Sequence, residues 1–329
     1  MYQAVIPVAG SGTRLKPHTY TYPKVLLTVG DKPILGHIVD RVISSGIKNI
    51  CFVIGYLGNK VRDYIDKNYK NKVNVSYVIQ EEQRGLGHAI WLTKNNIKGP
   101  LFIILGDTII ETNLNEFFDN KYAKLGIVEV SDPQRFGIVK IDNNFISDMV
   151  EKPKNPPTNL AIAGIYSFPD SKKLYDAIDH ILLTDKTTKG EIQLTDAMKY
   201  MIDNGHRIKP VKINGWYDCG KPETLLATNK YILSKKSKKY IIKGSVIIEP
   251  VHISKTAKIK NSIIGPYVSV GDQTQVICSI ISNSIINENA LIKNSNLTDS
   301  LIGPSAVVIG KKNSFNVGEN SEIRIVSEE

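Results

Sequence analysis

The sequence predicts two domains of different class: a doubly wound, mostly parallel α/β domain over residues 1–232 and a parallel β-helix over residues 241–329. Strand-like and helix-like patterns alternate through the first part of the chain, which is typical of a parallel sheet covered by helices. Beyond about residue 241, helical periodicity ends and apolar β-branched residues recur six positions apart. A Lys-rich linker at 233–240 lies between the two patterns.

The first domain begins with a short apolar strand at Val5–Val8 that runs into a glycine turn. Apolar residues at helical spacing over 34–43 predict a helix that ends before Gly46. Such an order predicts a Rossmann-like sheet, in which ligands bind beyond the carboxyl ends of the strands. The other strands that we expect span 50–55, 73–79, 101–105 and 146–150.

The second domain carries an imperfect hexapeptide repeat. Ile264, Val270 and Val276 are spaced by six residues, and Ile286 and Ile292 repeat the interval. Short β-branched segments at this period favour a parallel β-helix. The pattern resembles the left-handed β-helix of hexapeptide repeats, in which three hexapeptides close one turn, so we expect four or five coils. An irregular β-sandwich is the alternative.

Composition excludes several classes of protein. Hydrophobic residues make up 42% and charged residues 22% of the chain, as in ordinary globular proteins. No apolar run reaches the roughly 18 residues of a membrane span, and the early strand leaves no room for a signal peptide. The net charge of +10 is spread along the chain, which disfavours nucleic-acid binding. Three scattered cysteines indicate neither disulfides nor zinc, so we expect a reducing cytoplasm.

The glycine turn after the first strand predicts a polyphosphate site. Gly10 and Gly12 let backbone N–H groups approach an anion, while Arg14 and Lys24 supply positive charge. The dinucleotide motif G-x-G-x-x-G is excluded because Leu15 replaces its third glycine. The P-loop is excluded as well, since no Gly-Lys-Ser/Thr follows.

The turn and the residues after it form the pattern G-x-G-T-R-x(8)-P-K. This pattern resembles the signature of the sugar nucleotidyltransferases (nucleoside-diphosphate-sugar pyrophosphorylases), and in particular glucose-1-phosphate thymidylyltransferases and uridylyltransferases. The resemblance implies a set of nucleotide-binding residues: Ala9, Gly10, Ser11, Gly12, Thr13, Arg14, Lys24, Gln80, Gly85 and Asp107.

Two aspartates suggest a magnesium site. Asp107 follows a buried strand, and Asp218 ends an apolar strand in Gly-Trp-Tyr-Asp-Cys-Gly. Carboxylates together with nucleotide phosphates suit Mg²⁺, and the resemblance implies that both aspartates hold it. A lone Gly-Asp is otherwise a turn or helix cap.

Further segments match the base and sugar sites of the same family. Gln80, with the Arg-Gly-Leu-Gly-His-Ala stretch after it, implies recognition of a uracil or thymine ring, since an amide both donates and accepts. Pro153 biases Lys152 toward an extended backbone. Phe136 stands where many relatives carry Tyr. The resemblance assigns sugar-phosphate binding to Gly137, Glu151, Lys152, Gly164 and Lys189.

The resemblance implies an enzyme that joins a nucleoside triphosphate, dTTP or UTP, to glucose 1-phosphate and releases pyrophosphate. Its catalytic residues would be Arg14, Lys24, Asp107, Lys152 and Asp218. The alternatives are a GTP- or ATP-using relative with another hexose phosphate and a non-catalytic regulatory subunit of the same fold. We expect a homo-oligomer that binds neither nucleic acid nor membrane.

The histidines carry no clear metal or catalytic pattern. His18, His37, His88, His180 and His206 lack mutual metal spacing and are expected at the surface or in packing. His252, in the repeat region, leaves open an acyl-transferring tail, for which binding of acetyl-CoA would be the test.

Overall fold

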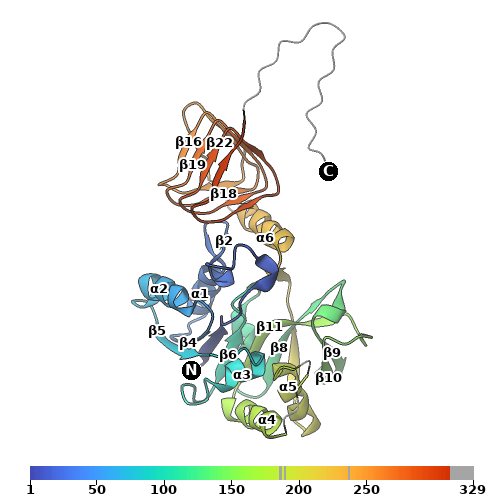
Figure 1. Ribbon diagram of the computed structural model, residues 1–329. Helices are drawn as coiled ribbons and strands as arrows, with labels where there is room; N and C mark the ends of the chain where they lie inside the picture. The colour runs from blue at the N-terminus through green and yellow to red at the C-terminus, as the bar shows by residue number, and fades with distance from the viewer. Residues whose placement is uncertain (185–186, 189, 236–237, 312–329) are drawn as a thin grey trace. The chain divides into compact units, whose positions relative to one another are not determined.

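The computed structural model describes residues 1–184, 187–188, 190–235 and 238–311. The chain divides into two compact units, Met1–Ile232 and Leu233–Glu329. Figure 1 shows an α/β fold in the first unit and stacked short strands in the second. Both architectures predicted from the sequence are confirmed.

The parallel half of the first unit holds four strands in the order β6-β1-β4-β5. The strands at its centre are apolar, and their side chains are almost fully buried. Continuous apolar strands of this kind form where helices cover both faces of a parallel sheet. The bounds are β1 (Gln3–Pro7), β4 (Asn49–Ile54), β5 (Asn74–Ile79) and β6 (Leu101–Ile104).

The other half of the same nine-stranded sheet is largely antiparallel. Its long strand β11 pairs antiparallel with β6, β8 and β9, while β12 runs parallel to β8. Because β11 reverses direction beside β6, its residues near 164 lie next to the carboxyl end of β6. The bounds are β8 (Ala123–Glu129), β9 (Gly137–Asp142), β10 (Phe145–Glu151), β11 (Leu160–Phe168) and β12 (Ile208–Lys212).

Helices lie against this sheet (Figure 1). The helix predicted at 34–43 is α1, and Asp170 caps α4 by accepting a hydrogen bond from the Lys172 amide at 3.0 Å. No helix among the described residues is both long and apolar enough to cross a bilayer. The bounds are α1 (Ile34–Ser44), α2 (Gly58–Tyr69), α3 (Leu86–Trp91), α4 (Ser171–Leu183), α5 (Leu194–Asp203) and α6 (Pro222–Ser234).

A two-stranded ribbon outside the main sheet positions one of the two aspartates. Strand β7 (Thr108–Glu111) follows Asp107 directly and pairs antiparallel with β13 (Gly215–Asp218). The register places Asp218 opposite Thr108, one residue from Asp107. Strand pairing therefore places the two aspartates close to each other along the ribbon, although they are distant in sequence. A second short ribbon joins β2 (Thr28–Val29) to β3 (Lys32–Pro33).

The second unit contains three four-stranded parallel sheets, and successive strands along the chain belong to different sheets. This arrangement is that of a parallel β-helix and is consistent with the predicted left-handed type. The described residues form four coils. Successive coils are 17 and 16 residues apart, because Val251 pairs with Val268 and Ile285 with Leu301. Each coil is thus one or two residues shorter than three hexapeptides. The first sheet is β14 (Val246–Ile247), β17 (Ile263–Ile264), β20 (Ile280–Ile281) and β23 (Asn296–Leu297). The second is β15 (Val251–Ile253), β18 (Val268–Val270), β21 (Ile285–Ile286) and β24 (Leu301–Ile302). The third is β16 (Lys258–Lys260), β19 (Gln275–Ile277), β22 (Leu291–Lys293) and β25 (Val307–Ile309).

The core of the coils comes from the residues that carry the sequence repeat. Ile264, Val270, Val276 and Ile292 are fully buried, and Ile286 is 1% exposed. The hexapeptide positions therefore point inward and stack from coil to coil.

This core predicts a selective loss of stability in the second unit. Ile264→Ala should lower the free energy of unfolding by about 2–5 kcal/mol, because it leaves a cavity in the coil interior. Ile280→Ala, at a position that is 49% exposed on the neighbouring coil, should change it by less than about 0.5 kcal/mol. Urea unfolding followed by circular dichroism measures both. Equal losses in the two variants would contradict the inward orientation of Ile264.

Candidate active site

The glycine turn between β1 and the 3-10 helix η1 (Thr13–Leu15) has two glycines with different surroundings. Gly12 has a φ of 64°, and a Cβ there would lie 2.9 Å from Cβ of Lys24. Thr19 Oγ1 donates a hydrogen bond of 2.9 Å to the Gly12 carbonyl. A Cβ on Gly10 would meet no heavy atom within 4 Å. The turn is therefore fixed at Gly12 and open at Gly10, where an anion can approach the backbone.

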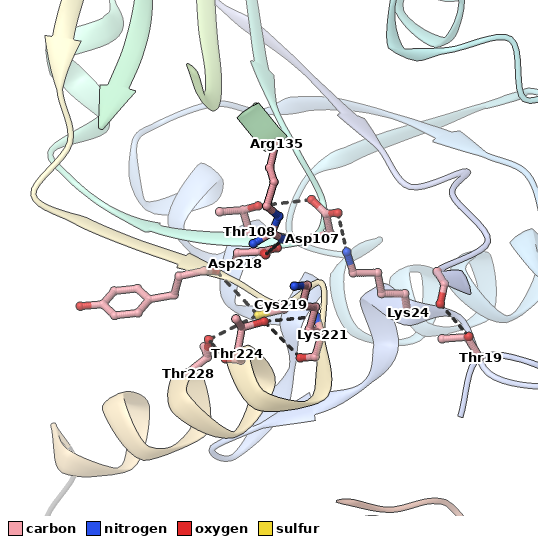
Figure 2. A network of polar contacts seen from close by, with 12 residues as sticks. Thr19, Lys24, Asp107, Thr108, Arg135, Asp218, Cys219, Lys221, Thr224 and Thr228 are labelled. Carbon is pink, nitrogen blue, oxygen red and sulfur yellow. Dashed lines mark hydrogen bonds and ion pairs between the residues drawn. The ribbon is translucent and has the colours of Figure 1, made fainter. Parts of the chain in front are cut away.

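An ion pair joins this turn to the end of β6. Lys24, on the 3-10 helix η2 (Lys24–Leu26), is buried, and its Nζ lies 2.6 Å from Oδ2 of Asp107 (Figure 2). Burial is the largest single effect and raises the pKa of the Asp107 carboxyl, but the charge and hydrogen bond of Lys24, the Thr108 hydroxyl and Arg14 together lower it more. The pKa of Asp107 therefore lies below its ordinary value, and the carboxylate is ionised at neutral pH.

Asp218 lies beside Asp107, as the β7–β13 ribbon dictates. The amide of Cys219 donates to the Asp107 carbonyl at 3.2 Å. A Cβ on Gly220 would lie 2.8 Å from Asp218 Oδ1 and 3.0 Å from Nη2 of Arg14, so the arginine also reaches this corner. Two adjacent carboxylates offer the hard oxygen ligands that Mg²⁺ prefers, and phosphate oxygens and water complete such a site. Among the described residues, no group of three or more His, Cys, Asp or Glu side chains is placed to hold a metal ion.

Arg135 enters this corner without having been predicted from the sequence. It ends the 3-10 helix η4 (Pro133–Arg135), and its guanidinium lies 3.9 Å from Asp218 (Figure 2). The same guanidinium lies over the ring of Phe136, 5.3 Å from the ring centre. Its one signal in the sequence was its place directly before Phe136-Gly137, which the family resemblance had already singled out. A permanently charged fork here can bind phosphate oxygens.

A cavity of about 260 Å³ opens beside the aspartates, over β10 and β11. Glu151 and Thr195 are among the polar residues that line it. Oε2 of Glu151 accepts a hydrogen bond from Thr195 Oγ1 at 2.8 Å, which fixes the position of the carboxylate. A Cβ on Gly137 would lie 2.9 Å from that carboxylate, so only glycine leaves the space free. Other residues singled out from the sequence also line this cavity: Arg14, Asp107, Phe136, Lys152, Gly164 and Asp218.

The backbone of Lys152 differs from the prediction. Its φ is 43°, in the left-handed region, rather than the extended conformation expected before Pro153. A hydrogen bond of 3.0 Å from the Lys152 amide to the Phe136 carbonyl holds it there, since the chain must turn at the end of β10. Its Nζ lies 3.4 Å from Glu151 Oε1. Tertiary contacts thus outweigh the local preference, as is common for strained residues in binding sites.

A second cavity, of about 280 Å³, adjoins the first and shares Leu86, Leu105 and Asp107 with it. Four further residues of the predicted nucleotide site line it: Ala9, Gly10, Gln80 and Gly85. Gly85 has a φ of 101°, and a Cβ there would lie 2.6 Å from the Ile192 carbonyl oxygen. A side chain at position 85 would therefore clash with the backbone of Ile192, whether or not a ligand is bound.

His88, expected in packing, orients Gln80. Gln80 is buried, and its Nε2 lies 3.2 Å from both the Gly85 carbonyl and Nδ1 of His88. Burial lowers the pKa of His88, with Arg84 adding to the effect, so the ring is neutral and Nδ1 can accept. The Gln80 amide nitrogen is thus occupied by partners within the chain.

The remaining predicted residues lie elsewhere. Ser11, Gly12 and Thr13 belong to the glycine turn but line neither cavity, and Lys24 lies beneath them. Lys189 lies outside the described residues. The structure therefore brings the glycine turn, both aspartates, Gln80 and the Glu151–Lys152 pair around two connected cavities.

An α/β sheet with this glycine turn and these acids at its carboxyl edge defines a nucleotide-binding transferase. A family model described as "Nucleotidyl transferase" matches residues 3–235, and the chain belongs to that family. The family prediction from the sequence is confirmed.

Relatives with names of the same class match most of the chain. It is 38% identical over 256 residues to "Bifunctional protein GlmU" of Methanocaldococcus jannaschii, covering 75% of this chain but only 60% of that protein. It is 32% identical to "Low-salt glycan biosynthesis nucleotidyltransferase Agl11" of Haloferax volcanii, covering 98% of this chain and 100% of that protein. A crystal structure of a UDP-glucose pyrophosphorylase with UDP-glucose is similar with a TM-score of 0.64 and 27% identity, over 72% of this chain and 100% of that chain.

The ion pair at the centre of the site predicts a pH effect. Lys24→Met removes the ammonium but keeps the burial that opposes ionisation, so the pKa of Asp107 should rise above its ordinary value. In the unaltered protein, the lowered pKa contributes stability above the ordinary carboxyl pKa, and this contribution is lost as the pH falls through the lowered pKa. Carboxyl ¹³C NMR titration measures the shift.

The matched control is Lys32→Met. Lys32 forms an ion pair of the same length, 2.6 Å, with Asp40, away from both cavities. The Lys32→Met substitution should therefore leave the pKa of Asp107 unchanged. An Asp107 pKa that stays low in Lys24→Met would show that another group holds the carboxylate in its ionised form.

Proposed function

We propose that this protein transfers a nucleotidyl group from a nucleoside triphosphate to a sugar 1-phosphate and releases pyrophosphate. The observation that carries the proposal is the position of Asp107 where two cavities meet. One cavity has the glycine turn and Gln80, which suit a nucleotide. The other has Glu151 and Lys152, which suit the hydroxyls and the phosphate of a sugar.

The reaction needs alignment more than acid–base catalysis. A sugar phosphate is largely dianionic at neutral pH, since its second pKa is near 6, and its oxygen can attack the α-phosphorus in line as pyrophosphate leaves. Holding two polyanions together is the main task of the protein. Arg14 and the amides of the glycine turn would stabilise the leaving pyrophosphate, and Lys24 would neutralise charge near the α-phosphate. Lys152 would hold the incoming phosphate, a role that we extend to Lys189.

Asp107 and Asp218 would hold Mg²⁺ once phosphate is bound. The ion would supply a positive charge shared between the phosphates of the two substrates. Lys24 keeps Asp107 ionised and therefore ready to act as a ligand. Arg135, close to Asp218, adds a second positive group on the same side.

The nucleotide base that we favour is a pyrimidine. The Gln80 nitrogen is occupied by the Gly85 carbonyl and His88, which leaves the amide oxygen to accept from N3–H of uracil or thymine. Neighbouring Gln83 also lines this cavity. We therefore propose UTP or dTTP, with glucose 1-phosphate as the sugar. The similarity to a UDP-glucose pyrophosphorylase supports the uridine choice.

The presence of the charged set favours an enzyme over a non-catalytic nucleotide-sugar-binding subunit. A regulatory relative would have no need for Arg14, Lys24 and Lys152 together with both aspartates. Cys51, Cys219 and Cys278 are free, which suits a reducing compartment such as the cytoplasm.

We also propose that the protein is a homo-oligomer. Large apolar side chains that are 44–62% exposed on the second unit support this, because such side chains gain from burial against another subunit. These residues are Val246, Ile248, Ile280, Val307 and Ile309.

Removing a charged contact to the phosphates should lower turnover. Arg14→Ala and Asp107→Ala should each reduce kcat by about 10²–10³-fold, the usual effect of losing one electrostatic contact in the transition state. Pyrophosphate release from UTP or dTTP with glucose 1-phosphate, with and without Mg²⁺, measures this. Lys16→Ala is the control, since Lys16 lies over the Tyr20 ring and lines neither cavity. Folded variants with near-normal turnover would remove both residues from the mechanism.

The choice of base has a separate test. Gln80→Ala should raise the KM for UTP or dTTP by about 3- to 10-fold, as expected for one lost hydrogen bond. The KM for the sugar phosphate should stay the same. Assaying five nucleoside triphosphates against several hexose 1-phosphates identifies the substrates, and a purine preference that survives in Gln80→Ala would argue against the pyrimidine assignment.

A further inference from the structure

A cavity of about 380 Å³ lies at the opposite edge of the main sheet from Asp107. Phe168, which lines it, pairs with Leu101 at the start of β6, whereas Asp107 follows the end of that strand. Helices α4 and α5 border the cavity, and both are drawn beside the sheet in Figure 1. The lining residues that matter chemically are Lys121, Tyr122, Asp170, Lys173, His206 and Arg207.

The cavity has an excess of positive charge. Lys121, Lys173 and Arg207 form no ion pair with any carboxylate within the described part of the chain. Asp170 is the acidic residue among those that line it, and its carboxylate already caps α4 through the Lys172 amide. Three cations against one carboxylate leave a site that favours a ligand with about two negative charges.

Aromatic rings hold two of these cations in place. The Lys121 ammonium lies 5.1 Å from the centre of the Tyr122 ring, and the Arg207 guanidinium lies 5.2 Å from that of Phe145. The two rings contact each other edge to face, with centres 5.2 Å apart. Ring faces position a cation without neutralising it, so the charges remain available to an anion.

We propose that this cavity binds a phosphomonoester of sugar size. A phosphomonoester is mostly dianionic at neutral pH, and Arg207 can bind two of its oxygens while the lysines act as point charges. His206 and Asp170 also line the cavity, and their side chains are of the kind that hydrogen-bonds sugar hydroxyl groups. The volume is within the range of small-molecule sites.

Two elements line both this cavity and the one beside the aspartates. Strand β11 contributes Phe168 here and Gly164 there, and α5 contributes Met201 here and Leu194 there. The two sites are therefore separate but share rigid elements. Binding here does not depend on the proposed transfer reaction.

The test is calorimetric titration of the full chain with glucose 6-phosphate, which lacks the anomeric phosphate of a nucleotidyl acceptor. We expect saturable 1:1 binding that weakens at least about tenfold in Lys173→Gln and in Arg207→Gln, because each loses a charge-assisted contact. Lys172→Gln is the matched control, since this neighbour on α4 does not line the cavity and should leave the affinity unchanged.

Two further titrations separate the other sources of binding. Glu151→Gln alters the cavity beside the aspartates and should leave the affinity for glucose 6-phosphate unchanged. If the Glu151→Gln variant lost binding and the Arg207→Gln variant kept it, the proposal would be overturned. Inorganic phosphate should bind more weakly than glucose 6-phosphate. Equal affinity for the two would overturn the sugar part, and absence of saturable binding would overturn the whole inference.

Discussion

The ion pair between Lys24 and Asp107 is the contact on which the rest of the site depends. It joins the segment after the glycine turn to the carboxyl end of β6 at 2.6 Å. The same lysine packs against Gly12 so closely that the turn has no room for a Cβ. One side chain therefore fixes the shape of the anion-binding turn and keeps an acid ionised beneath it.

The ribbon of β7 and β13 extends this arrangement. It places Asp218 opposite Thr108, where Arg135 lies 3.9 Å from the Asp218 carboxylate and Arg14 lies beside Gly220. Alternating charges of this kind hold one another in position before any ligand binds, which lowers the reorganisation needed during reaction. The two cavities share Asp107, and in the proposed function one of them would bind the nucleotide and the other the sugar phosphate.

Positive side chains have different partners at the two ends of the strands in the main sheet. At the edge near Asp107, Lys24 and Lys152 lie against carboxylates, so their charge is partly balanced. At the opposite edge, Lys121 and Arg207 lie against aromatic rings, and their charge stays unbalanced. The first arrangement suits phosphates that arrive with a metal, and the second suits a phosphate that arrives alone.

The sequence by itself determined the order of strands and helices, the repeat that builds the coils, and several of the charged residues and glycines around the two cavities. These features depend on local spacing: apolar periodicity, the position of glycines, and acids at strand ends. Only the tertiary structure decided the antiparallel half of the sheet, the left-handed backbone of Lys152 and the part played by Arg135 and His88. Each of these follows from contacts between segments far apart in the chain, such as the Phe136 carbonyl that holds Lys152, and no local pattern records such contacts.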